Sequence, residues 1–379
     1  MEEQLWKACA DGKVEEVIKL LRNEQIDVNW QDSFFQSTSF YFACEEGHID
    51  IVKLLLNDQR VDGSINQANK YNKTPFYSAC ENGHIEIVKE LLNDNRVDTS
   101  GLTPFWIACV LGKIEDVKLL LNDESVDVNQ ADKYDKATPF HIACQNGHVE
   151  IVKLLLDNER IGDDINKTNK DEKTPFYSAC EKGYIEIVDL LNNRVDINQT
   201  NKHRQTPLYI ACWNGHLEIV QLLLNDERVD INKANNLGTT PFCKACENGH
   251  IKIVKLLLSD ERVDIHQADS FSTPFYRACE NGHIEIVKLL NDESVDLNKR
   301  NRDGQTPFHI ACENGHIQIV KLLLKDERID INKAHNGQTP FFIACQNGHI
   351  EIVVLFLGNP RSIFPSFLLF FLIANKIVN

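Results

Sequence analysis

The sequence is poor in methionine and has no excess of positive charge. Met1 is the only methionine among its 379 residues, and 40 Lys and Arg residues stand against 56 Asp and Glu residues, which gives a formal net charge of −16. A uniformly acidic chain repels nucleic acid and anionic lipid. We therefore expect no nucleic-acid partner.

The N-terminus lacks an apolar signal core and an Arg-rich transit segment, because the chain begins Met1-Glu-Glu-Gln-Leu-Trp-Lys. The expected location is the reducing cytoplasm, where the twelve cysteines stay free rather than forming disulfides. A hydrophobic content of 42% with 25% charged residues excludes wholesale disorder and a polytopic membrane protein.

Motifs of catalysis and of cofactor binding are also missing. The sequence has no H-E-x-x-H, no G-x-x-x-x-G-K-[ST], and no G-x-G-x-x-G that follows a strand and opens a helix. No Ser or Cys stands apart beside a base and an orienting acid. These absences favour a protein that is not an enzyme and that has no cofactor and no bound metal.

An internal repeat is the dominant feature of the sequence. A Thr followed by Pro and, in most copies, an aromatic residue recurs about every 33 residues, and an Ala-Cys pair follows each Thr by five residues. An earlier Ala-Cys pair at Ala8-Cys9 brings the number of units to eleven. We predict an N-terminal capping repeat over 1–37, ten tandem repeats over 38–358 that form one solenoid, and a hydrophobic tail over 359–379. The repeated threonines, with Thr38 a degenerate copy, are Thr74, Thr103, Thr138, Thr174, Thr206, Thr240, Thr273, Thr306 and Thr339.

Each unit is typical of a finger-like loop followed by two antiparallel helices. In residues 138–157, Thr138 is suited to cap the first helix and Pro139 to occupy its first position, where no N–H is needed. Gly147 ends that helix by taking a left-handed conformation. In the second helix, Glu150 and Lys153 form a solvent-facing pair. A single unit cannot bury both of its faces, so the expected fold is an all-α repeat solenoid.

The repeat unit resembles that of the ankyrin repeat family. A representative copy is Thr306-Pro-Phe-His-Ile-Ala-Cys-Glu-Asn-Gly-His316, followed by Ile-Gln-Ile-Val-Lys-Leu-Leu-Leu. The resemblance covers more than nine-tenths of the chain. The resemblance implies a scaffold or adaptor that binds partner proteins on its concave face, through the finger tips and two variable positions after Ala-Cys. The signature His survives only at His141 and His309. The Gly-Ala-Asp usual after the second helix is replaced by longer runs such as Asn-Asp-Glu-Arg-Val-Asp.

The recurring cysteines and histidines are interpreted as structural. Eleven cysteines share one repeat position, where packed helices about 8–10 Å apart are too distant for disulfides. Cys243 and Cys246 form one Cys-x-x-Cys, which lacks the second half of a zinc site. The eight Gly-His pairs are expected to hydrogen-bond backbone at the turn between helices.

Candidate binding residues lie where the pattern breaks on an exposed face. Val110, Leu111 and Trp213 are apolar where most other repeats carry Glu-Asn or Gln-Asn. Exposed large apolar groups are candidate binding anchors, although each could equally contact only an adjacent finger. Further candidates on the fingers and first helices are Tyr71, Tyr134, His203, Arg204, Phe271, Arg277 and Arg302.

One finger, which begins at Thr99, is four residues shorter than the others and directly precedes the repeat that carries Val110 and Leu111. We hypothesise that this shortening notches the groove and that the notch and the apolar pair form one recognition site. The other fingers are net basic within an acidic chain, notably at Lys70, Lys73, Lys202, Arg204, Lys299, Arg300 and Arg302. This distribution favours a partner with an acidic surface.

The C-terminal tail leaves three alternatives open. Residues 363–374 are almost entirely apolar, but twelve helical residues reach about 18 Å, short of the ~30 Å hydrocarbon core. The tail is an atypical cap or self-association element, a short membrane anchor through residues 363–378, or a segment without a role. Accordingly, the alternatives to a free scaffold are a membrane-tethered adaptor and a targeting or regulatory subunit of a separate enzyme.

Overall fold

The computed structural model describes residues 1–99 and 102–363, and its secondary structure there is almost entirely helical. These residues contain 22 α-helices and no β-strand, with two short 3₁₀ helices, η1 (Gln59–Gly63) and η2 (Gly162–Asn166). Isolated β-bridges join Gln31 to Thr38 and His335 to Gln338 at the base of two fingers. The helices form eleven pairs, which confirms the predicted all-α repeat solenoid.

The chain divides into two compact units, Met1–Asp196 and Ile197–Asn379. The first unit holds repeats one to six. Its first helices are α1 (Glu2–Ala10), α3 (Ser39–Glu45), α5 (Pro75–Glu81), α7 (Pro104–Leu111), α9 (Pro139–Gln145) and α11 (Pro175–Lys182). Its second helices are α2 (Val14–Leu21), α4 (Ile49–Leu56), α6 (Ile85–Leu92), α8 (Ile114–Leu121), α10 (Val149–Leu156) and α12 (Ile185–Leu191).

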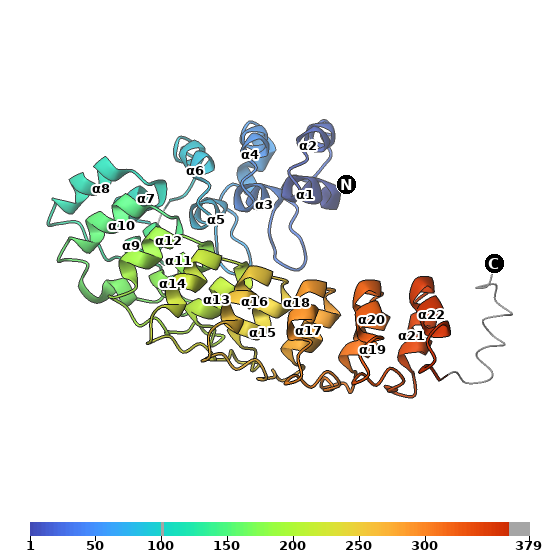
Figure 1. Ribbon diagram of the computed structural model, residues 1–379. Helices are drawn as coiled ribbons and strands as arrows, with labels where there is room; N and C mark the ends of the chain where they lie inside the picture. The colour runs from blue at the N-terminus through green and yellow to red at the C-terminus, as the bar shows by residue number, and fades with distance from the viewer. Residues whose placement is uncertain (100–101, 364–379) are drawn as a thin grey trace. The chain divides into compact units, whose positions relative to one another are not determined.

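The second unit holds repeats seven to eleven, and its helix pairs stand side by side with the finger loops along one edge (Figure 1). Its first helices are α13 (Pro207–Asn214), α15 (Pro241–Glu247), α17 (Pro274–Glu280), α19 (Pro307–Glu313) and α21 (Pro340–Gln346). Its second helices are α14 (Leu217–Leu224), α16 (Ile251–Leu258), α18 (Ile284–Leu290), α20 (Ile317–Leu323) and α22 (Ile350–Leu357).

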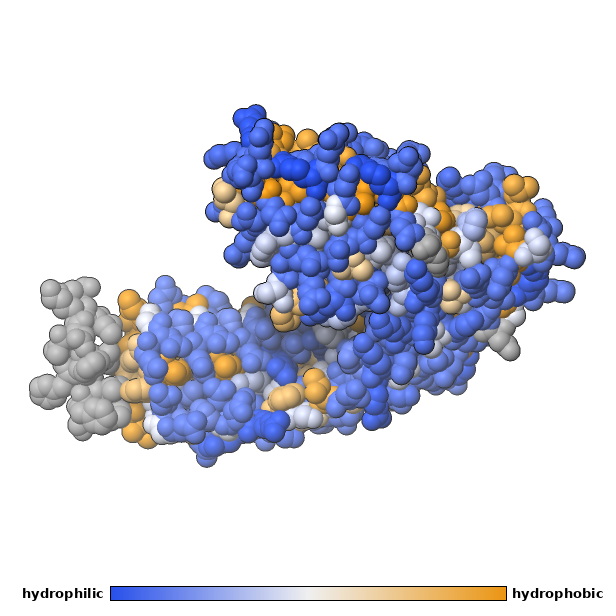
Figure 2. Space-filling model, turned by 180° about the vertical axis from the view of Figure 1, so that it is seen from behind, coloured by the Kyte–Doolittle hydropathy of each residue, from blue (hydrophilic) through white to orange (hydrophobic). Residues whose placement is uncertain are grey.

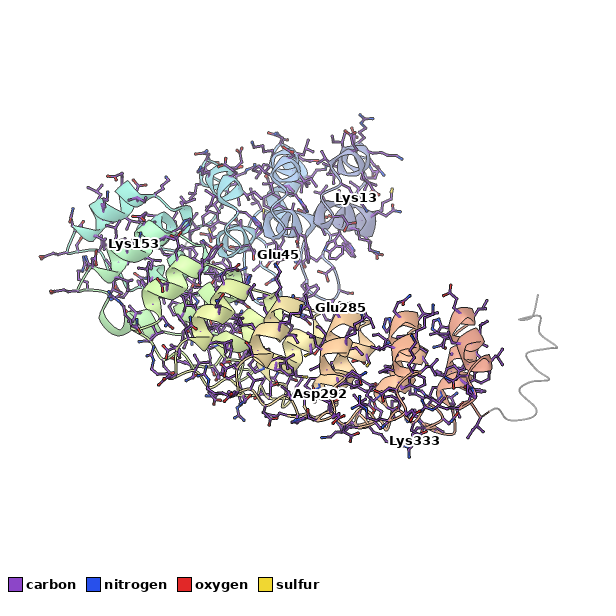
Figure 3. The ribbon with its side chains drawn as sticks, viewed as in Figure 1. Lys13, Glu45, Lys153, Glu285, Asp292 and Lys333 are labelled. Carbon is purple, nitrogen blue, oxygen red and sulfur yellow. The ribbon has the colours of Figure 1, made fainter. Side chains whose placement is uncertain are left out.

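The first helix of the fifth repeat, α9, begins and ends as the sequence predicts. Thr138 Oγ1 accepts a hydrogen bond from the His141 N–H at 3.1 Å, and Pro139 occupies the first helical position. The chain turns after α9 through Gly147, whose φ is +77°. On the outer face of α10, Lys153 Nζ lies 2.8 Å from Glu150 Oε1, and Lys153 reaches into solvent (Figure 3).

A histidine at the start of most second helices ties its repeat to the one before. His283 Nε2 lies 2.9 Å from the carbonyl oxygen of Glu247, at the end of the preceding first helix. The ring also packs so closely on Gly249 that a Cβ atom there would meet His283 Cε1 at 2.5 Å. The backbone-bonded interpretation is confirmed for seven of the eight Gly-His pairs, and these bonds join neighbouring repeats.

Most fingers are shaped by one Asn or Asp near the tip. Asn235 Oδ1 accepts hydrogen bonds from the N–H groups of Leu237 and Thr239, at 2.9 and 3.0 Å. Its amide Nδ2 donates to the hydroxyl of Tyr209 in the preceding repeat at 3.1 Å. Tyr209 occupies the position of the signature His. A Tyr–Asn hydrogen bond between adjacent repeats is therefore present where that His is missing.

The core is built from the repeated apolar positions. All twelve cysteines are free, and all are buried except Cys345, which is half-buried. Burial raises the pKa of Cys9 to about 12, so its thiol stays protonated near neutral pH. The outer surface is largely hydrophilic, with hydrophobic residues in small patches (Figure 2). The cysteines therefore act as small core residues, as the sequence predicts.

The C-terminal tail falls almost wholly outside the described residues, which end at Ile363. The cap, the anchor and the segment without a role, as predictions for residues 363–378, therefore stay untested beyond that point. Within the described part of the chain, no helix combines the length and apolar character needed to cross a bilayer.

Candidate partner-binding site

A hollow of about 500 Å³ on the finger side of the second unit brings together four of the predicted binding residues, His203, Trp213, Phe271 and Arg277. Three consecutive repeats contribute to it: the seventh supplies His203 and Trp213, and the ninth supplies Phe271 and Arg277. The eighth repeat supplies Leu237 and Lys244, which the sequence analysis did not single out.

Apolar side chains are exposed at the rim of this hollow. Trp213 is 38% exposed and Leu237 is 51% exposed, while Phe271 is half-buried. Trp213 is held by an edge-to-face contact with Tyr209, with ring centroids 5.9 Å apart. Its backbone carbonyl accepts from Asn248 Nδ2 at 2.8 Å and lies 2.9 Å from His250 Nε2. An exposed aromatic ring on a fixed backbone is an anchor that loses little entropy on binding.

Two cations stand at the same position of successive repeats, where the other repeats carry Ser, Ile or Phe except the first, which has Lys7. Lys244 Nζ lies 4.1 Å from the centre of the Trp213 ring, a cation–π distance, and 2.8 Å from Glu247 Oε1. Arg277 occupies the equivalent place in the next repeat. Both cations are largely buried, at 11% and 20% side-chain exposure, so they shape the floor of the hollow.

Arg277 is held by three carboxylates. Its guanidinium lies 3.2 Å from Asp269 Oδ2, 3.0 Å from Glu280 Oε2 and 3.9 Å from Glu247 Oε2. Burial alone would lower the pKa of Arg277, but the charge of Asp269, the hydrogen bond to Glu280 and the charge of Glu247 raise it above its ordinary value. The charges of the floor are thus paired, and the hollow favours an apolar group rather than an ion.

The hollow exists where two residues depart from the repeat pattern. Cys243 stands where most repeats have Tyr or His, and its short side chain leaves space on the finger side of α15. Asp269 stands where neighbouring fingers have Asn, and its carboxylate accepts from the hydroxyl of Thr239 at 3.3 Å and from Arg277. The Arg277 head group therefore reaches toward the finger instead of solvent.

The remaining candidates of the second unit lie on the finger tips. The Arg302 N–H donates to the carbonyl of Phe271 at 2.6 Å, and its guanidinium carbon lies 5.8 Å from the centre of the Phe271 ring. Arg204 is exposed at its finger tip with φ +58°. Arg302 therefore extends the aromatic edge of the hollow, and Arg204 adds positive charge next to His203.

Leu237 and Lys244 were missed for different reasons. Lys244 breaks the Ser, Ile or Phe pattern four residues after the repeat Thr, as the predicted residue Arg277 does one repeat later. Leu237, directly before Gly238, is an aliphatic residue at a finger tip, whereas the tips of other fingers are polar or aromatic. Both signals are visible in an aligned reading of the repeats.

In the first unit, Tyr71 and Tyr134 line a second hollow, of about 680 Å³, together with Asn72 and four lysines. Tyr71 is 50% exposed, whereas Tyr134 is half-buried and packs on Tyr77 with ring centroids 4.6 Å apart. The two predicted tyrosines belong to the third and fifth repeats, so the hollow spans the fourth.

The prediction that Val110 and Leu111 are exposed is wrong. Val110 is fully buried and Leu111 is 8% exposed. Gln145 of the fifth repeat donates from Nε2 to the carbonyl of Glu81 in the third repeat at 2.8 Å, bridging the fourth repeat, which contains the apolar pair. The neighbouring repeats thereby close over the last turn of α7, and the apolar pair serves as core.

The predicted notch therefore does not form a recognition site with that pair. Residues 100 and 101 of the shortened finger lie outside the described residues. On either side of them, the third and fifth repeats meet through Tyr77 and Tyr134. The shortened finger of the fourth repeat lets the third and fifth repeats approach each other. Instead of a notch, the structure has a convergence of the fingers on either side.

No group of three or more His, Cys, Asp or Glu side chains is arranged to hold a metal ion in residues 1–99 and 102–363. Cys243 and Cys246 are both buried thiols, and Cys243 Sγ lies 4.0 Å from Asp269 Oδ2. The Cys-x-x-Cys pair is therefore part of the packing around the hollow.

Stacked helix pairs with protruding fingers and hollows between the fingers define a repeat protein of the binding-scaffold class. The family model described as "Ankyrin repeats (3 copies)" matches residues 5–100, 61–132, 105–201, 160–235, 190–269, 227–301 and 275–363. The chain belongs to the ankyrin repeat family, and this membership indicates a protein-binding scaffold.

One similar solved structure is the crystal structure of the human ASB11 ankyrin repeat domain. It has 27% sequence identity and a TM-score of 0.49, and the match covers 55% of this chain and 91% of that chain. No curated protein sequence gives a significant match.

Proposed function

We propose that the protein is a non-enzymatic scaffold or adaptor that binds a partner protein at the hollow of its second unit. The observation that carries the proposal is the exposed Trp213 ring beside Leu237 and Phe271, above the paired charges of Lys244 and Arg277. A partner side chain that buries this aromatic rim gains hydrophobic free energy without separating an ion pair.

The partner chemistry follows from the same arrangement. The apolar rim fits an aliphatic or aromatic anchor, and the exposed His203, Arg204 and Arg302 surround it with positive charge. An anchor flanked by acidic residues therefore suits the site, since rim charges mainly steer association and select partners. A cytoplasmic, reducing location fits the twelve free cysteines.

The test is quantitative affinity purification with the full chain and with Trp213→Ala and Leu237→Ala variants. Leu289→Ala is the matched control, because Leu289 is 37% exposed on α18, a second helix away from the fingers. We expect the same interacting proteins for the wild type and the control, and a loss of at least one of them with both hollow variants. An unchanged set of proteins with both hollow variants would refute the proposed site.

The membrane-tethered alternative depends on residues 363–378, which lie outside the described residues except for Ile363. No observation within the described part of the chain favours it, and none favours a targeting subunit of a separate enzyme over a free scaffold.

A further inference from the structure

The second hollow, in the first unit, is lined by positive charge. Its lining consists of Lys70, Tyr71, Asn72, Lys133, Tyr134, Lys136 and Lys170, which come from the tips of the third, fifth and sixth fingers. No carboxylate belongs to this lining, although the chain as a whole carries a net charge of −16.

The convergence of the fingers creates this concentration of lysines. Tyr77 and Tyr134 are in ring contact at 4.6 Å across the shortened finger, and the Lys170 N–H donates to the carbonyl of Asp135 at 2.6 Å. Fingers that a regular array would hold two repeats apart thus contribute to one hollow. The local charge density is higher than any single finger provides.

Three of the four lysines, Lys70, Lys136 and Lys170, are not neutralised by a paired carboxylate within residues 1–99 and 102–363. Lys70 Nζ lies 4.1 Å from the centre of the Phe34 ring and 4.8 Å from that of Phe35, which orients it without neutralising it. Lys133 Nζ lies 4.8 Å from the centre of the Tyr134 ring.

The two acidic groups of the fifth finger are turned inward, whereas in the sixth finger Asp171 is half-buried and Glu172 is exposed. Asp132 is 3% exposed and accepts hydrogen bonds from the N–H groups of Tyr134, Asp135 and Ala137 at 2.7–2.8 Å. Asp135 is 5% exposed and accepts from Asn169 Nδ2 at 2.8 Å. The carboxylates of Asp132 and Asp135 are therefore held inside the fifth finger and do not pair with the lysines at the mouth of the hollow.

We propose that this hollow, the lysine hollow, binds a short acidic segment of a partner protein, with its carboxylates on Lys70, Lys136 and Lys170 and its backbone against Tyr71. Because the lining is positively charged, the ligand should be an anion, and the size of the hollow limits the bound segment to a few residues. A nucleic acid needs a longer positive track, and the adjacent finger over residues 29–37 carries Asp32 and no Lys or Arg. The site is separate from the hollow around Trp213 and shares with it only the premise that the fingers bind protein.

The test measures binding of a fluorescein-labelled octapeptide of glutamate to the full chain by fluorescence anisotropy. The triple variant Lys70→Gln/Lys136→Gln/Lys170→Gln should weaken binding at least about tenfold, since three charge-assisted contacts are lost. The control Lys89→Gln/Lys118→Gln/Lys153→Gln removes the same charge from second helices, where these lysines pair with Glu86, Glu115 and Glu150. It should change the affinity less than about twofold.

A second variant separates binding from folding. Lys136 adopts φ +60°, a left-handed conformation that glycine takes without strain, so Lys136→Gly should fold and still bind the peptide more weakly. Trp213→Ala should bind it like the wild type, so failure at one hollow is distinguishable from failure at the other. Equal losses in both triple variants, or tighter binding of a labelled single-stranded oligothymidylate than of the peptide at 0.15 M salt, would overturn the proposal.

Discussion

Gln145 donates a hydrogen bond from its side-chain amide to the main-chain carbonyl of Glu81, 64 residues earlier, over a distance of 2.8 Å. Neighbouring repeats are about half that far apart in sequence, so this bond links two repeats that a regular array keeps separate. The histidine that would tie the fourth repeat to the third is replaced by Lys113. The bond from Gln145 therefore replaces the missing tie from one repeat further along.

Replacing Gln145 with Ala should destabilise the first unit by about 1 kcal/mol, because the part-buried carbonyl of Glu81 loses its side-chain donor. Urea denaturation followed by circular dichroism measures the change, and hydrogen exchange locates it in α5, α7 and α9. The control is Gln346→Ala, at the same repeat position, whose amide oxygen accepts an exposed hydrogen bond from Gln338. A loss in the control as large as that in Gln145→Ala would contradict the bridging role.

The close approach of Gly249 and His283 gives a second prediction. Gly249 has φ +78°, and an added Cβ would meet the His283 ring at 2.5 Å. Gly249→Ala should therefore lose about 1 kcal/mol to left-handed strain and about 1 kcal/mol more when His283 leaves the carbonyl of Glu247. Urea denaturation of the full chain measures the total.

Gly348→Ala is the matched control for that variant. Gly348 has φ +75°, but a Cβ there meets nothing within 4 Å, so only the backbone strain applies. The difference between the two variants isolates the contact with the next repeat. Equal destabilisation by both would show that the histidine contact contributes nothing.

Much of the fold could be predicted from the sequence because its determinants are local. Thr138 and Pro139 act within one turn of helix, and the ring of His283 contacts the glycine of the preceding unit in a relation that every regular repeat preserves. The proximity of Trp213 and Phe271 follows from the register of the repeats alone, because the fingers and the ends of the first helices lie on the same face of the solenoid.

The burial of Val110 and Leu111 could not be predicted in that way. The third and fifth repeats meet directly through the bond from Gln145 to Glu81, on either side of the short finger, and Val110 and Leu111 are buried in the repeat between them. A pattern aligned repeat by repeat assigns each position the environment of its equivalents. A change in loop length that alters which repeats meet lies outside such a pattern.

The buried cysteines predict low thiol reactivity. Burial raises the pKa of Cys345, the half-buried thiol, to about 11 and raises those of the buried thiols further. The native chain should react with Ellman's reagent at Cys345 at most, and the urea-unfolded chain at all twelve cysteines. Cys345→Ala should abolish the fast native reaction, and rapid labelling of several native thiols would contradict the packed core.

Two buried groups of the first unit should give opposite pH dependences of stability. Burial lowers the pKa of His141 to about 4, below its unfolded value of about 6.5, so its contribution rises as the pH increases from about 4 to 6.5. Burial and the charge of Glu81 raise the pKa of Asp135 to about 7, despite Lys73, from an unfolded value of about 3.9. Its contribution is therefore full at low pH and is lost as the pH rises through 7.

The variant Asp135→Asn tests this opposition, because an amide keeps an oxygen acceptor for Asn169 Nδ2 and removes the buried charge. It should stabilise the first unit at pH 8 by on the order of 3 kcal/mol, with a smaller gain at pH 5. In Asp135→Asn, only His141 of the two groups still titrates, so the urea midpoint of the first unit should rise between pH 4 and 6.5. In His141→Gln, the urea midpoint should instead fall between pH 4 and 7, because Asp135 still titrates. Parallel pH profiles in the two variants would show that these groups do not set the pH response.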